Sequence, residues 1–157
     1  MKVKNSNRRR GRFIRYAPLF LWVAVVLFAS TGNASMSETS RFIRPLLHFL
    51  FPSAPEETLI GYHAFVRKCA HFTEYAALAF LSWRAFRHSS VAVLQKFWFA
   101  FAFLIVLFVA SVDEYNQSFN RARTGSIYDV ALDCAGGLTM LALLALAGRR
   151  SLLKDRK

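Results

Sequence analysis

The sequence predicts an all-α fold, a polytopic membrane protein built as a bundle of four transmembrane helices. Of its 157 residues 55% are hydrophobic and 16 are phenylalanine, yet its formal net charge is +12. Soluble domains of this length rarely combine so apolar a composition with so large a charge. The apolar residues are also gathered in four blocks, each about as long as a helix that crosses a bilayer core of about 30 Å.

The four expected spans are residues 16–31, 69–86, 91–112 and 127–147. The first span follows a basic segment, residues 1–15, and no well-placed small-residue cleavage site follows it, so we expect an uncleaved anchor. The second span contains His71, Glu74 and Arg84, and the fourth contains Asp129 and Asp133, whereas the third is the clearest span. Between the first two, residues 40–51 are expected either to rest on the membrane surface or to pack on the bundle.

The distribution of basic residues predicts the topology. With the N-terminus in the cytoplasm, fifteen of the 21 basic residues fall on the inner side and six on the outer side. By the positive-inside rule, this asymmetry places both termini in the cytoplasm and the loops around residues 32–59 and 115–126 outside. The six outer basic residues are Arg41, Arg44, Arg67, Lys68, Arg121 and Arg123.

Polar residues recur with helical spacing at the outer ends of the last three spans. At about 100° per residue, Arg67, His71 and Glu74 share one stripe of the second span. Asp113 stands one turn before Gln117 at the end of the third span, and Asp129 stands one turn before Asp133 on the fourth. Ionisable groups at membrane depth are costly unless they have partners or a task, so we expect them to form one cluster. The candidate residues for this ligand-binding or polar cluster are Arg67, Lys68, His71, Glu74, Tyr75, Asp113, Glu114, Gln117, Arg123, Asp129 and Asp133.

Small residues follow the two aspartates on the fourth span. Gly136 and Gly137, with Ala135, are expected to let a neighbouring helix approach closely. The same residues would permit a homo-oligomer, which the sequence neither requires nor excludes.

Two segments, RKCAHFTEYAALAFL and DEYNQSFNRARTGSIYDVALDCAGG, resemble the VanZ-like membrane proteins. The shared pattern is a basic pair, His-Phe and Tyr on one helix, then Asp-Glu, Gln, Arg and Asp before a helix rich in small residues. It covers residues 67–137 of what we expect to be a single domain, residues 1–157. Asn116 stands where a His is common, and residues 120–122 lack the usual Pro-Gly. The resemblance assigns family positions to Lys68, His71, Phe72, Tyr75, Asp113, Glu114, Gln117, Arg123, Asp129 and Asp133.

The resemblance implies a protein of the cell envelope, because the family takes its name from a protein linked to teicoplanin resistance. A set of ion pairs holding the helices together is one interpretation of the cluster, but buried ion pairs are often no more stabilising than apolar packing. We therefore favour recognition of a glycopeptide, a lipid-linked cell-wall intermediate or a lipid headgroup. The alternatives are a membrane-embedded enzyme acting on a lipid phosphate, with His71 beside Glu74 and Tyr75, and a transport bundle.

The placement of the basic residues and the absence of known motifs predict the remaining partners and cofactors. The basic residues flank the apolar blocks instead of alternating with exposed aromatics, so we expect membrane lipids as partners and no nucleic acid. Cys69 and Cys134 lack the spacing of metal ligands, and no cofactor or metal site is assigned. No complete catalytic motif supports an enzyme, although in that alternative the carboxylates would hold a divalent cation.

Overall fold

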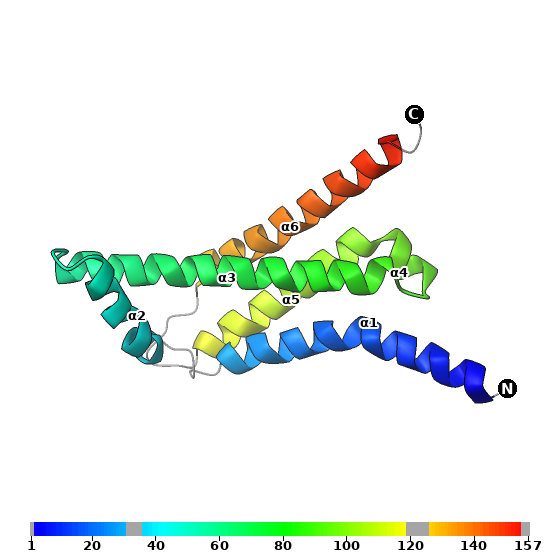
Figure 1. The fold of residues 1–157 in the computed structure, drawn as a ribbon, viewed down its shortest axis with the longest axis horizontal. Coiled ribbons are helices and arrows are strands. Elements are labelled where there is room, and N and C mark those ends of the chain that lie inside the picture. The colour runs from blue at the N-terminus through cyan, green and yellow to red at the C-terminus, as the bar shows by residue number, and fades with distance from the viewer. Residues whose placement is uncertain (1, 31–35, 119–125, 155–157) are drawn as a thin grey trace.

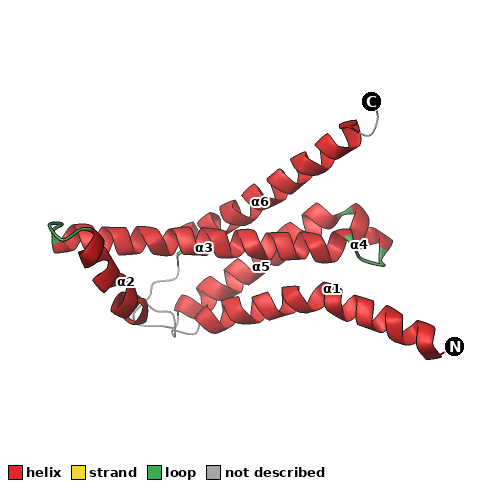
Figure 2. Cartoon of the chain, in the orientation of Figure 1, coloured by secondary structure: helices red, strands yellow, loops and turns green. Residues whose placement is uncertain are grey.

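The computed structural model of the chain describes residues 2–30, 36–118 and 126–154 (Figure 1). Every regular element in these ranges is helical, which confirms the all-α prediction (Figure 2). The helices are α1 (Lys2–Phe28), α2 (Met36–Leu50), α3 (Glu56–Arg87), α4 (Ala92–Lys96), α5 (Trp98–Ser118) and α6 (Ile127–Lys154).

The central element is α3, which contacts each of the other five helices. It begins with Glu56 and Glu57 in its first turn and has Arg84 and Arg87 in its last turn, charges that complement the helix dipole. In Figure 1 both chain termini lie at the end of the bundle where α3 leads into α4. The end of α5 and the start of α6 lie toward the other end, where α2 packs on α3.

The core lies where α1, α3, α5 and α6 meet. Four of its twelve buried members are alanines, so the helix backbones can approach closely. These members are Leu19, Val26, Tyr75, Leu78, Ala79, Ala85, Phe86, Ala102, Val106, Val109, Ala110 and Leu141.

The glycine pair on α6 packs at the closest approach of this helix to its neighbours, as predicted. A Cβ atom on Gly136 would overlap the backbone carbonyl of Phe72 in α3. A Cβ atom on Gly137 would lie 2.6 Å from Cγ1 of Val106 in α5. Gly136 is therefore required for α6 to sit in the groove between α3 and α5, because backbone cannot move aside, whereas a larger residue at Gly137 would need the Val106 side chain to shift.

The segment between the first two long helices forms α2. Arg44 of α2 pairs with Glu56 at the start of α3, and Nε2 of His48 lies 3.6 Å from Oε2 of the same glutamate. Leu47 is buried, whereas Phe49 is 81% exposed. The segment thus packs on the bundle through one face and presents aromatic surface on another.

The third expected span differs from the structure at both ends. Phe97 interrupts it, with φ −108° and ψ 30°, so that the short α4 ends before α5 begins at Trp98. At its other end α5 continues past Val112 to Ser118. It continues because Asp113, Glu114 and Gln117 are buried against neighbouring helices instead of forming a solvated loop.

Two helical segments, Trp98–Ser118 and Ile127–Gly148, are long and apolar enough to cross a membrane. The apolar part of α1, Phe13–Phe28, is shorter, and charged residues recur along α3, so apolarity alone supports two of the four expected spans. Only 33% and 22% of the residues in the two apolar segments are buried. A core helix of a soluble protein would be mostly buried, so these helices have surface available for lipid.

We expect Gly136→Ala to lower the stability of the bundle, because the added methyl group meets the rigid backbone of α3. Overpacking of this kind costs about 1 to 3 kcal/mol. Gly148→Ala on the same helix is the matched control, since nothing lies within 4 Å of its added Cβ. Thermal unfolding of the purified proteins in detergent measures both changes; equal stability of the two variants would contradict the close packing.

Candidate functional site

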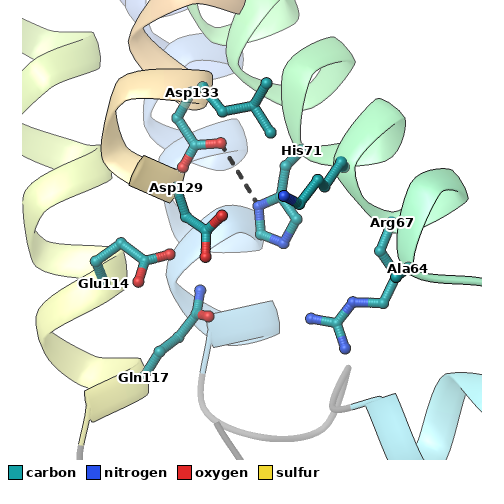
Figure 3. Close-up of a pocket in the computed structure, with 9 residues that line it drawn as sticks. Ala64, Arg67, His71, Glu114, Gln117, Asp129 and Asp133 are labelled. Carbon is teal, nitrogen blue, oxygen red and sulfur yellow. Dashed lines mark ion pairs between the residues drawn. The ribbon is translucent and has the colours of Figure 1, made fainter. Parts of the chain in front are cut away.

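A cavity of about 150 Å³ lies between α3, α5 and α6 (Figure 3). Arg67, Lys68 and His71 line it from α3, and Glu114 and Gln117 line it from α5. The lining residues of α6 are Asp129, Leu132 and Asp133, and Ala64 completes the wall on α3. Each helix contributes residues three or four positions apart, so one face of each helix borders the cavity.

Asp113 lies beside this cavity as a buried carboxylate with a donor on each oxygen. Asp113 is only 2% exposed. The Tyr75 hydroxyl donates to Oδ2 and the Gln117 amide donates to Oδ1, both at 3.0 Å. The backbone carbonyl of Asp113 accepts a further hydrogen bond from the Ser30 hydroxyl. Donors on α3, on α5 and just beyond the end of α1 therefore fix this residue in place.

Asp133 is equally buried, but its carboxylate lacks such donors. The residue is 1% exposed, and neither carboxylate oxygen accepts a hydrogen bond from any residue that the structure describes. Nδ1 of His71 lies 3.7 Å from Oδ1, within ion-pair range but beyond hydrogen-bond range (Figure 3). A buried carboxylate in this situation is unstable as an isolated anion.

Glu114 fixes the start of α6. Its Oε2 accepts a hydrogen bond from the backbone N–H of Ser126, the residue before the helix, at 2.9 Å. The Ser126 hydroxyl in turn accepts the backbone N–H of Tyr128. These contacts satisfy backbone donors at the helix start and set the register in which Asp129 and Asp133 enter the cavity wall.

The model of the VanZ/LLP1 family matches residues 15–148, which is most of the chain. The chain belongs to the VanZ/LLP1 family. The match includes all four long helices in whole or in part, together with the residues that line the cavity. Family membership and the two long apolar helices together indicate a membrane protein. No curated protein and no solved structure matched the chain.

The structure of this VanZ/LLP1 protein brings most of the predicted cluster together. Tyr75 and Asp113 form the hydrogen-bonded pair beside the cavity. Glu74 lies elsewhere, in a separate hollow with Trp22 and Cys69. Arg121 and Arg123 lie outside the described residues, as does any pairing that involves them. The predicted residues that line the cavity are Arg67, Lys68, His71, Glu114, Gln117, Asp129 and Asp133.

Two contributors to the site were not predicted. Ser30 reaches Asp113 from α1's end, and nothing in the local sequence indicates a contact over 83 positions. For Ser126 the sequence did contain a signal of its role. This residue stands three positions before Asp129, in the Ser-x-x-Asp pattern that often marks a helix start. That pattern predicts the beginning of α6, although not the contact of Ser126 with Glu114.

His63 stands one turn before Arg67 on α3. His63 is buried, and its burial together with the nearby Arg67 guanidinium lowers its pKa. The cavity itself has the cations Arg67 and Lys68 on its α3 side. The carboxylates Glu114, Asp129 and Asp133 supply the opposite side from α5 and α6. Such a cavity can bind a small group that carries both an anion and hydrogen-bond donors.

We expect Tyr75→Phe to destabilise the protein by about 1 to 3 kcal/mol, because it removes a donor from a buried carboxylate. Asp113→Asn should weaken the same contact, so the loss in the double variant should be smaller than the sum of the single losses. Tyr128→Phe, at a residue 81% exposed, is the control and should change little. Chemical unfolding in detergent measures the cycle; strictly additive losses would show that the hydroxyl and the carboxylate do not interact.

Proposed function

We propose that this VanZ/LLP1 protein recognises the polar headgroup of a lipid or lipid-linked cell-wall intermediate at the outer face of the cell membrane. The observation that carries the proposal is the cavity between α3, α5 and α6, with cations on one wall and carboxylates on the other. Arg67 and Lys68 would bind a phosphate. Asp129 and Glu114 would accept hydrogen bonds from sugar hydroxyl or amide groups.

The size of the cavity favours a headgroup over a whole antibiotic. Pockets for drug-sized ligands measure about 300 to 1,000 Å³, whereas this cavity measures about 150 Å³. A phosphate with part of a sugar fits such a volume, and a complete glycopeptide does not. Teicoplanin resistance would then arise indirectly, from binding of an envelope lipid that changes how the antibiotic's target is displayed.

Exposed apolar side chains beside the cavity favour an amphiphilic ligand over a water-soluble one. Phe65 follows cavity-lining Ala64 and is 66% exposed. Ile127 and Tyr128 precede cavity-lining Asp129 and are 80% and 81% exposed. Acyl or polyprenyl chains can pack on such residues while the headgroup occupies the cavity.

In this proposal α1, α3, α5 and α6 all cross the membrane, with both termini in the cytoplasm. The excess of basic residues near the termini supports this orientation. On α3, Arg67, Lys68 and His71 would be tolerated at membrane depth because they border the polar cavity. The cavity then opens near the outer leaflet, since it lies at the end of α5 and the start of α6.

The orientation predicts opposite labelling of two engineered cysteines. In a background with Cys69→Ala and Cys134→Ala, Ser53→Cys should react with a membrane-impermeant maleimide in intact cells. Ser90→Cys, between α3 and α4, should react only after lysis; both serines are exposed in the structure. Labelling of Ser90→Cys, but not Ser53→Cys, in intact cells would reverse the proposed topology.

Headgroup recognition predicts that Lys68→Gln lowers retention of anionic lipid by roughly five- to tenfold, the effect of one charge-assisted hydrogen bond near the surface. Native mass spectrometry of protein purified from membranes measures the bound lipid. Lys96→Gln is the matched control, because Lys96 lies on α4, away from the cavity.

Teicoplanin susceptibility provides a second readout of the same variants. Cells that make the wild-type protein or Lys96→Gln should be less susceptible than cells that make Lys68→Gln at matched membrane levels. Equal lipid retention by all three proteins would contradict headgroup recognition. Equal susceptibility with unequal retention would separate the lipid site from antibiotic resistance.

A further inference from the structure

We infer that His71, Asp113 and Asp133 form a binding site for one divalent metal ion of the Zn²⁺ or Mn²⁺ class. The three residues come from α3, α5 and α6, the helices that enclose the cavity. A ring nitrogen of His71 and one carboxylate oxygen from each aspartate lie within 4.8 Å of one another. Ligand atoms about 2.0 to 2.2 Å from a shared metal lie roughly 3 to 4 Å apart, so a small closure completes the site.

The orphaned carboxylate of Asp133 points to a cation. Both of its oxygens are buried without a hydrogen-bond donor among the described residues, on a residue 1% exposed. Nδ1 of His71 lies 3.7 Å from Oδ1, an ion-pair distance that gives neither oxygen a hydrogen bond (Figure 3). A metal ion between these groups would give the carboxylate the positive partner that a buried anion needs.

Asp113 already has the support that metal-binding carboxylates usually have. Tyr75 and Gln117 each donate to one of its oxygens, which fixes the orientation of the carboxylate. A carboxylate has about four acceptor positions, so both oxygens keep capacity for a metal. Outer donors that orient a ligand in this way are common around protein metal sites.

The set of ligands selects the class of metal. One imidazole nitrogen with two carboxylates suits Zn²⁺ and Mn²⁺ better than Ca²⁺, which prefers oxygen ligands throughout. Two carboxylates and a neutral imidazole carry a charge that one divalent ion neutralises. His71 and Asp133 also line the cavity, so an open coordination position would face it.

The site can be tested without any lipid. The full-length protein, purified in detergent and treated with EDTA, is titrated with Zn²⁺ or Mn²⁺ alone, and the bound metal is counted by mass spectrometry after desalting. We expect one ion per chain and a rise in thermal stability on binding. Asp133→Asn should weaken binding at least tenfold and abolish the thermal shift. Glu57→Gln, which neutralises an exposed carboxylate of α3 outside the cavity, should retain both within about threefold.

Asp133→Asn also distinguishes a metal site from a simple ion pair with His71. Without metal, the substitution should leave stability equal or higher if Asp133 is an unsatisfied anion, and should lower it if the pair stabilises the fold. Mn²⁺ bound to wild-type protein containing ¹⁵N-histidine should show nitrogen coupling by electron–nuclear double resonance, a measurement that needs no variant.

The inference is overturned if the wild-type protein binds neither metal more tightly than Asp133→Asn does. It is also overturned if Glu57→Gln lowers binding equally, or if bound Mn²⁺ shows no histidine coupling. Because no lipid takes part, a failure here leaves the lipid retention expected for Lys68→Gln unaffected. A failure of lipid retention likewise leaves the metal titration unaffected.

Discussion

The close approach of α6 to α3 and α5 is the constraint on which the site depends. Gly136 stands three residues after Asp133, on the same face of the helix. Because Gly136 packs on the carbonyl of Phe72, Asp133 is carried into the seam between α3 and α5, next to His71. Larger residues at the glycines would separate the helices and give Asp133 access to water. The packing that stabilises the bundle therefore also buries an unsatisfied carboxylate.

Helical periodicity predicted the faces of the helices but not their neighbours. The spacing of Arg67 and His71 correctly placed both on one face of α3, and they line the cavity. Glu74 follows His71 by three residues, yet it lies at a different hollow, where its backbone carbonyl accepts a hydrogen bond from Trp22 of α1. The helix α3 has neighbours on several sides, so the edge of a stripe can face a different helix from its centre. Sequence spacing contains no information about that choice.

The sequence pattern likewise did not predict contacts between residues that lie far apart in the chain. The spacing of Asp113 and Gln117, one turn apart, predicts that their side chains can meet, and they do. The hydrogen bond from Tyr75 joins residues 38 positions apart and depends on how α3 packs against α5. The length of α5 was missed for the same reason. The outer loop was expected to begin near Tyr115, but the helix continues to Ser118 because Glu114 and Gln117 are buried against neighbouring helices.

The arrangement of the buried acids argues against a cluster that serves only to hold the helices together. Structural polar groups in an apolar bundle are stabilising when each has its partners, and Asp113 meets that condition through neutral donors. Asp133 does not, although it lies in the same seam and is equally buried. An apolar residue at its position would pack against α3 without the cost of burying a charge. A carboxylate kept there at that cost, beside a cavity with cationic and anionic walls, is better explained by a ligand that completes the site than by stability.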